Sequence, residues 1–328
     1  MWKRWFARAG TLGKKLEAKR SGGSDRTVKV EVEDTYAEAF EGVYCRVIVT
    51  ADNKRTLRAA ANDSTATPSV VINRVEGGVE KWLSKRETPD RREGALVQFW
   101  GQINPKKAFA ESLKKFETEL SYRIRQDILV MPFTAVYDDL PSAEGKLDMM
   151  NRVGHCGDGY EWVEKRHWRE VIVVPLMVPD FVIERYVGYA RGVMGANFWV
   201  MCKTKTALKE VERKTLETIH KMEGVVTPFD ICSAGSKPET HYPLIGPTTN
   251  HEYCPSLRKK LGKSSKVPEN VRYIPEIVIN GISLAAVKDA MKAGIEAARK
   301  IDGVLRISAG NYGGKLGEYK INLRELAS

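Results

Sequence analysis

Three polar stretches of the chain combine residue types that can perform chemistry. Residues 33–40 (EDTYAEAF) place three carboxylates within six residues, and residues 248–255 (TTNHEYCP) form a segment rich in hydrogen-bond donors and acceptors. Residues 308–317 (SAGNYGGKLG) hold four glycines within eight residues, together with Lys315. Glycines let a backbone approach a ligand closely, and a lysine attracts an anion. The last stretch therefore predicts a ligand-binding loop.

Each of these stretches also has a simpler structural explanation. Asp34 or Thr35 could cap a short helix, with Glu38 one turn later satisfying its backbone donors. The glycine-rich stretch is not a P-loop, because Leu316 stands where that motif needs a magnesium-binding hydroxyl. A tight turn would account for two glycines more easily than for four. Both interpretations, a structural loop and a ligand site, therefore remain possible for each of these stretches.

Glu276 is the residue best suited to proton transfer. It opens an apolar stretch, residues 276–279 (EIVI), where burial would favour the neutral form of its carboxyl group. A carboxyl group with a raised pKa can donate and accept protons near neutral pH. The alternative is a glutamate at a strand end that faces water.

The cysteines and histidines do not predict a metal site. Five cysteines are an odd number, and no Cys-x-x-Cys pair occurs. His155-Cys156 and His251-x-x-Cys254 lack a second pair at zinc-finger spacing. We therefore expect reduced thiols in a cytoplasmic protein that binds no metal.

Four segments repeat a pattern that can position these residues, namely an apolar strand, an amphipathic helix and a second apolar strand. The expected elements are strand 43–50, helix 54–61 and strand 69–72; strand 95–100, helix 107–125 and strand 128–136; strand 197–202, helix 207–222 and strand 225–229; and strand 276–279, helix 284–299 and strand 304–308.

Two such units in succession have the βαββαβ order of a ferredoxin-like sandwich. The pattern therefore predicts an α+β protein, a duplicated ferredoxin-like α/β sandwich. We place a basic, flexible extension at residues 1–26, an N-terminal lobe at residues 27–166 and a C-terminal lobe at residues 167–328. Residues 141–169, rich in glycine, histidine and charge, are expected to cross between the lobes.

The positive charge lies mainly in the extension. The chain carries a net charge of +11, and residues 1–26 contribute +6 of it through eight basic and two acidic residues, which leaves +5. That remainder is mild, and no aromatic stacking pattern of an RNA-binding sheet occurs, so we expect no nucleic acid. No run of about 18 apolar residues predicts a transmembrane segment. Trp2, Trp5 and Phe6 could dock on an anionic surface or a partner, and a disordered tail is the simpler alternative.

The polar stretches resemble motifs of the formylmethanofuran:tetrahydromethanopterin formyltransferase family. Residues 33–40 resemble its opening motif, and residues 308–316 are similar to its closing motif nearly residue for residue. The resemblance is colinear over residues 28–326. Its other motifs are Thr88-Pro89-Asp90, Gly157-Asp158-Gly159-Tyr160, Gly195-Ala196-Asn197-Phe198, Ser236-Lys237, Thr249-Asn250 and Glu276-Ile277-Val278-Ile279.

The resemblance implies transfer of a formyl group from formylmethanofuran, or a methylofuran-type analogue, to tetrahydromethanopterin in one-carbon metabolism. Both coenzymes are then substrates, no cofactor is bound, and the protein is a cytoplasmic homo-oligomer, a dimer or tetramer. Glu276 is the implied catalytic residue. The residues expected to bind the substrates are Asp34, Thr35, Glu38, Asn197, Ser236, Lys237, Thr249, Asn250, Asn311, Tyr312 and Lys315.

Three loops depart from the family pattern, at residues 64–68, 89–93 and 229–235. Glycines of the family pattern are missing from them, which removes backbone access of the kind that a coenzyme needs. An alternative function therefore stays open. In it, the chain is a catalytically divergent paralogue that acts as a binding or scaffold subunit of a formyltransferase/hydrolase complex.

Overall fold

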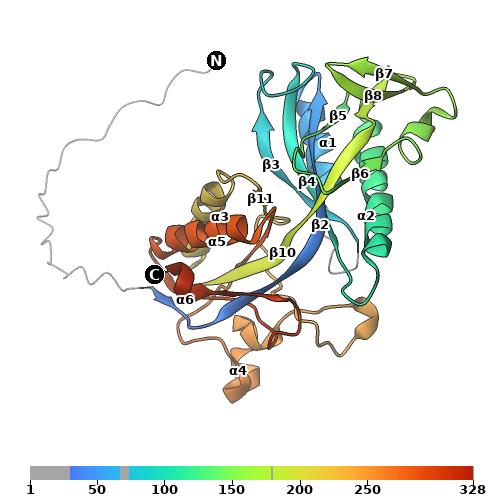
Figure 1. Ribbon diagram of the computed structural model, residues 1–328. Coiled ribbons are helices and arrows are strands. Elements are labelled where there is room, and N and C mark those ends of the chain that lie inside the picture. Colours follow the sequence, from blue (N-terminus) through green and yellow to red (C-terminus); the bar gives the residue numbers. More distant parts are fainter. Residues whose placement is uncertain (1–29, 67–73, 179, 328) are drawn as a thin grey trace, which may run out of the picture.

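The protein is an α+β structure with one large mixed sheet (Figure 1). This computed structural model describes residues 30–66, 74–178 and 180–327. The predicted extension at residues 1–26 and the predicted strand at residues 69–72 lie outside them. Among the described residues, no helix has the length and apolar character needed to cross a membrane.

Two long antiparallel strands connect the two halves of the molecule (Figure 1). They are β2 (Tyr36–Ala51) and β10 (Tyr186–Cys202), which pair in register around Gly42 opposite Gly192. A Cβ atom on Gly192 would lie 2.9 Å from the carbonyl oxygen of Gly281, so the backbones can approach this closely only where the side chain is absent. Each strand then continues into a different lobe.

The N-terminal lobe is an antiparallel sheet with the strand order β5-β2-β4-β3. Helices α1 and α2 pack on one face, over a core that includes Val47, Phe99 and Phe116. Asn53 caps α1, because its side chain accepts a hydrogen bond from the backbone N–H of Thr56 at 2.9 Å. The bounds are α1 (Lys54–Thr65), β3 (Glu76–Leu83), β4 (Glu93–Gln102), α2 (Phe109–Arg123), a π-helical turn (Ile124–Leu129) and β5 (Ala135–Asp138).

Additional strands extend this sheet beyond β5. Strand β9 pairs with β5 in parallel, and β8 and β7 follow toward the edge, while β6 pairs with the start of β10. The bounds are β6 (Gly145–Asp148), a 3-10 turn (Gly154–Gly157), β7 (Trp162–Arg166), β8 (Arg169–Val174) and β9 (Phe181–Glu184). The predicted boundary between residues 166 and 167 falls at the turn between β7 and β8. Strands β8 and β9 belong to the predicted C-terminal lobe by this boundary, but they pair within the N-terminal sheet.

The C-terminal lobe repeats the same antiparallel order as β13-β10-β12-β11. Helices α3 and α5 cover one face, and Thr204 and Ser283 cap them by accepting backbone N–H hydrogen bonds at 3.1 Å. Alternation along the strands sends Phe198 and Ile277 into this helical core. The bounds are α3 (Lys205–Ile219), β11 (Val225–Val226), β12 (Glu276–Gly281), α5 (Leu284–Arg299) and β13 (Val304–Ser308).

A long insertion, residues 227–275, covers the opposite face of this sheet (Figure 1). Met201 of β10 packs there against Val267 and Val271. The insertion contains α4 (Arg258–Leu261) and 3-10 turns at Pro243–Ile245, His251–Tyr253, Pro255–Leu257 and Gly262–Ser264. The remaining elements are β1 (Glu31–Val32), which pairs with β13, β14 (Tyr319–Asn322), which pairs with β2, and α6 (Leu323–Ala327).

Some predicted elements are confirmed and others are wrong. The helix predicted at 284–299 and the strand predicted at 304–308 have the bounds of α5 and β13. The strand predicted at 128–136 is largely wrong, because the chain continues as a π-helical turn after α2 and becomes strand only at Ala135. The crossing predicted at 141–169 contains β6 and β7 instead.

A buried carboxylate, Glu80 on β3, joins the two lobes. Arg46 binds it with two N–H groups, each at 2.9 Å, and the backbone N–H of Gly224, just before β11, donates to it at 2.8 Å. Gln98 donates at 2.6 Å. Burial alone would raise the pKa of Glu80, but these donors lower it below its usual value. The ionised form is thus fully paired between the lobes.

We predict that Glu80→Gln destabilises the protein by about 2 kcal/mol, because the amide cannot replace the charged hydrogen bonds to Arg46, which keeps Asp139 as its remaining carboxylate partner. The free energy of unfolding from a urea titration measures this effect. Glu87→Gln is the matched control, since Glu87 pairs with Lys81 on the surface and its loss should leave the unfolding midpoint nearly unchanged. Equal midpoints for the two variants would contradict the prediction.

Candidate active site

The candidate site lies on the face of the C-terminal sheet that the insertion covers. Trp199 on β10 is paired with Glu276 on one neighbouring strand and with Ser308 on the other. Directly opposed residues of antiparallel strands point to the same side of a sheet. The three side chains therefore emerge together beneath residues 227–275, away from α3 and α5.

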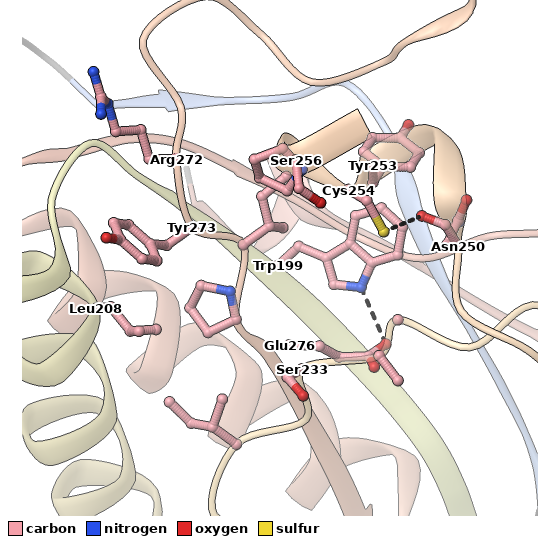
Figure 2. A pocket seen from close by; sticks show the side chains of 16 residues that line it. Trp199, Leu208, Ser233, Asn250, Tyr253, Cys254, Ser256, Arg272, Tyr273 and Glu276 are labelled. Carbon is pink, nitrogen blue, oxygen red and sulfur yellow. Dashed lines mark hydrogen bonds between the residues drawn. The ribbon is translucent and has the colours of Figure 1, made fainter. Parts of the chain in front are cut away.

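A cavity of about 310 Å³ opens over Glu276 (Figure 2). Its walls are largely apolar, with Leu208, Ile231 and Pro275 among them. Figure 2 shows the Trp199 ring in the middle of the lining, above Glu276. The lining residues are Trp199, Leu208, Ile231, Ser233, Ala234, Gly235, Asn250, Tyr253, Cys254, Pro255, Ser256, Arg272, Tyr273, Ile274, Pro275 and Glu276.

A second, more polar cavity of about 340 Å³ adjoins the first. Trp199, Asn250 and Tyr253 line both cavities, so they form the partition between them. Tyr253 packs edge-on against Trp199 with ring centroids 4.7 Å apart. The other lining residues are Glu33, Thr35, Lys237, Glu239, Glu252, Lys266, Ser308, Ala309, Asn311, Tyr312 and Gly313. Two separate ligands can thus approach one partition from its two sides.

Glu276 is buried, and two side chains of the described residues donate hydrogen bonds to it. The indole N–H of Trp199 donates to its Oε1 at 3.0 Å, and the Cys232 thiol forms the second side-chain hydrogen bond. Burial raises the pKa of Glu276, and the two hydrogen bonds only partly oppose this. The neutral carboxyl group is therefore favoured more than in a solvated glutamate, as the sequence predicted for this strand.

Cys232 is a protonated thiol at neutral pH rather than a nucleophile. Burial, together with the nearby Glu276 carboxylate, raises the pKa of Cys232 to about 11. The residue is fixed by backbone hydrogen bonds in both directions with Glu276, each at 2.9 Å. Its thiol is consequently available as a hydrogen-bond donor.

The glycine-rich loop binds a carboxylate of the protein itself. The backbone N–H groups of Tyr312 and Gly314 donate to Glu38 Oε1 at 2.6 Å each, and that of Leu316 donates to Oε2 at 2.8 Å. Burial would raise the pKa of Glu38, but these backbone donors lower it. Both oxygens of Glu38 are therefore engaged in holding the loop, and substrate binding by Glu38 stays a prediction.

Asn197 and Asn311 also act within the protein. Asn197 Oδ1 accepts the backbone N–H of Gly310 at 2.7 Å, which fixes the start of the loop. Asn311 donates to the hydroxyl of Thr35 at 2.8 Å. Thr35 and Asn311 nevertheless line the second cavity, whereas Asn197 lines neither cavity. The prediction that Asn197 contacts substrate therefore finds no support in this geometry.

The predicted residues of the insertion gather around the second cavity. Lys237 and Asn250 line it. The carbonyl of Ser236 accepts a hydrogen bond from the Tyr312 hydroxyl, and Thr249 donates to the carbonyl of Ala234 at 2.9 Å. Ser236 and Thr249 therefore hold the insertion and the glycine-rich loop in place.

Two predicted residues lie away from both cavities. Asp34 forms an exposed ion pair with Arg324 at 3.1 Å. Lys315 is exposed beyond the part of the loop that lines the second cavity. The predicted residues that line a cavity are Glu276, Asn250, Lys237, Tyr312, Asn311 and Thr35, whereas Asp34, Glu38, Asn197, Ser236, Thr249 and Lys315 line neither.

Sequence reasoning missed Trp199, Cys232 and Tyr253. Of these, Trp199 carries a sequence signal. Strand alternation could have identified it, because neighbours in a strand point to opposite faces and Phe198 faces the helices. Cys232 and Tyr253 carry no such signal, since they lie in the insertion outside its α-helix and outside the named strands. The described residues contain no group of three or more histidines, cysteines or acids suited to holding a metal ion.

Family models match almost the whole chain. The model described as formylmethanofuran-tetrahydromethanopterin formyltransferase matches residues 26–176, and the model described as its proximal lobe matches residues 179–326. A curated relative from Methanothermobacter thermautotrophicus is 58% identical over 89% of this chain and 96% of its own length. It is named a formylmethanofuran–tetrahydromethanopterin formyltransferase-like protein.

Solved structures of the family have the same fold. The formylmethanofuran:tetrahydromethanopterin formyltransferase from Methanosarcina barkeri superposes with a TM-score of 0.81 at 39% identity, covering 90% of this chain and 98% of that one. A chain of the formyltransferase/hydrolase complex from Methylorubrum extorquens, determined with methylofuran, also gives 0.81, at 30% identity over 91% of this chain and 97% of that one.

We predict that Glu38→Gln loosens the glycine-rich loop, because the amide keeps one acceptor oxygen and brings an N–H₂ group against backbone donors. Amide hydrogen exchange at Tyr312, Gly314 and Leu316 should accelerate by at least about tenfold. Glu318→Gln is the control, since that residue is exposed on the same loop. Unchanged exchange in Glu38→Gln would show that the carboxylate does not hold the loop.

Proposed function

Because this chain belongs to the formylmethanofuran-tetrahydromethanopterin formyltransferase family, we propose that it transfers a formyl group from formylmethanofuran, or a methylofuran-type analogue, to tetrahydromethanopterin. The observation that carries the proposal is Glu276, a buried carboxyl group at the floor of one cavity and beside the partition to another. Two adjoining cavities suit a reaction between two large substrates.

Formyl transfer between nitrogens needs one group that can both give and take a proton. The lone pair of the acceptor amine attacks the formyl carbon, and the π electrons of the carbonyl move to its oxygen. Neutral Glu276 then protonates the leaving nitrogen as its bond to carbon breaks and the carbonyl re-forms. The resulting carboxylate removes the proton from the newly formylated nitrogen, which regenerates the neutral acid.

The two cavities differ in the substrate groups that they suit. The apolar cavity over Glu276 suits a flat aromatic ring, whereas the second cavity places Lys237 and Lys266 where an anionic substrate group can lie. Lys266 pairs with Glu252 at 2.6 Å, while the Lys237 ammonium contacts only the carbonyl of Glu239 in the described hydrogen bonds. Lys237, Asn250 and Tyr312 are therefore the substrate-binding residues that we favour.

The proposal also includes the lobe architecture and the oligomeric state of the protein. The antiparallel order β5-β2-β4-β3, repeated as β13-β10-β12-β11, supports two ferredoxin-like lobes. The pairing of β9 with β5 supports a lobe boundary after Glu184 rather than at residue 166. The protein then works as a cytoplasmic homo-oligomer, a dimer or tetramer, that takes both coenzymes as substrates and binds no further cofactor.

A second candidate is a divergent paralogue that serves as a binding or scaffold subunit of a formyltransferase/hydrolase complex. Residues 229–235, which depart from the family pattern, supply Ile231, Ser233 and Ala234 to the wall of the first cavity. The chain is also more similar to a relative named as formyltransferase-like, at 58% identity, than to the enzyme from Methanosarcina barkeri, at 39%. A reshaped cavity would fit altered or lost activity.

We predict that the wild-type protein forms formyl-tetrahydromethanopterin from the two coenzymes, followed by the absorbance of the product. Glu276→Gln should reduce kcat by at least about 100-fold, because the amide can neither donate nor accept the transferred proton. Glu269→Gln, an exposed residue of the insertion, is the control and should retain wild-type kcat.

The outcomes separate the two candidates. Full activity in Glu276→Gln would remove that residue from the mechanism while leaving the reaction in place. A wild-type protein that binds a coenzyme in calorimetry but forms no product would instead support the scaffold subunit.

A further inference from the structure

We propose that Trp199 and Cys232 are positioning residues that orient the carboxyl group of Glu276, so that Oε1 accepts a hydrogen bond and Oε2 carries the proton in the neutral acid. This inference rests on the proposed function, because it concerns the group that moves the proton there. It assigns a role to two side chains that take no part in the proton transfer itself.

Trp199 fixes the role of one oxygen. An indole N–H can only donate, so Oε1, which lies 3.0 Å from it, has to be an acceptor in both protonation states of Glu276. The carbonyl oxygen of a neutral acid is a stronger acceptor than its hydroxyl oxygen, so the bond from the indole favours the proton on Oε2. The ring cannot easily turn away, because Trp199 is 3% exposed and Tyr253 packs edge-on against it.

Cys232 lies in the insertion, on the side of β12 opposite to Trp199. The isolated antiparallel bridge between Cys232 and Glu276 places the two residues directly opposite one another. Opposed residues share a face, which brings the thiol to the carboxyl group. The backbone N–H of Ala234 donates to the Cys232 sulfur at 3.4 Å, and the thiol forms its own hydrogen bond with the Glu276 carboxyl group.

Few other titratable groups face Glu276. The phenol of Tyr312, from the loop after β13, interacts with it electrostatically, and burial raises the pKa of that phenol, so it stays neutral. Arg272 and Tyr253 of the insertion line the same cavity. The hydrogen bonds of Glu276 come from Trp199 and Cys232, so these two side chains are the ones that distinguish its oxygens.

Both hydrogen bonds stabilise the ionised form, so their loss has a defined sign. Removing either donor should raise the pKa of Glu276 further, and the carboxylate should then form only at higher pH. A neutral acid with a higher pKa gives up its proton less readily, so protonation of the leaving nitrogen should slow. Substrate contacts are largely kept, so kcat should fall while KM changes little.

The test compares Trp199→Phe, Cys232→Ala and Cys232→Ser in the full chain. The protonated carboxyl group of Glu276 is followed by infrared difference spectroscopy over pH, and its band is identified by subtracting the spectrum of Glu276→Gln. Trp199→Phe and Cys232→Ala should each shift the titration midpoint upward by about one pH unit and reduce kcat by about tenfold. Cys232→Ser, which keeps a donor, should restore both values.

The controls separate positioning from packing. Trp82→Phe and Cys156→Ser change the same residue types away from the carboxyl group and should leave the midpoint and kcat unchanged. An unchanged midpoint in both Trp199→Phe and Cys232→Ala, with the far-ultraviolet circular dichroism of the wild type, would overturn the inference. If Trp199→Phe does not fold, the Cys232 pair alone decides.

The infrared arm also keeps this inference distinct from the proposed function. It reads the protonation of Glu276 in the absence of turnover, so a wild-type protein without activity still tests the positioning. If the wild type is active but the variants leave the titration midpoint of Glu276 unshifted, the inference alone is overturned. If the variants shift the midpoint but the wild type has no activity, the inference is supported and the formyltransferase function is contradicted.

Discussion

The antiparallel pairing of β2 with β10 is the constraint on which the rest of the structure depends. The strands meet at Gly42 and Gly192, where a side chain would collide with neighbouring groups. Four residues before this point β2 carries Glu38, and seven residues after it β10 carries Trp199. The carboxylate that holds the glycine-rich loop and the ring that divides the two cavities are therefore both fixed relative to one backbone pairing.

The sequence predicts those elements whose signals are local. Helix α5 follows a Ser283 cap and has regularly spaced apolar residues, so its bounds were predictable. Strand β3 was not, because Gly78 interrupts its apolar pattern. A Cβ atom on Gly78 would lie 2.8 Å from the Cβ of Val226 in the other lobe. The reason for that glycine is thus a contact between residues far apart in the chain, which no short pattern can reveal.

In the candidate site, too, some features follow from local sequence signals and others depend on residues far apart in the chain. The burial of Glu276 followed from the apolar residues beside it, since the neighbours in the strand determine its surroundings. Glu38 and Asn197 were expected to bind substrate because they belong to motifs that resemble those of the family. Their partners are instead the backbone N–H groups of a loop more than one hundred residues away. Sequence alone cannot distinguish a loop that awaits a ligand from one that already binds the protein's own carboxylate.

Three buried glutamates show how the surroundings, rather than residue type, decide the task. Glu38 receives backbone N–H groups and Glu80 receives a guanidinium, an amide and a backbone N–H, and in both cases these donors outweigh burial and lower the pKa. Both are therefore fixed charges that hold structure. From the part of the chain that the structure describes, Glu276 receives an indole N–H and a thiol, so burial prevails and its pKa is raised. A carboxyl group with so few donors can exchange a proton without breaking the fold. For this reason Glu276 is suited to chemistry, and the number of donors around it should set the pH at which it acts.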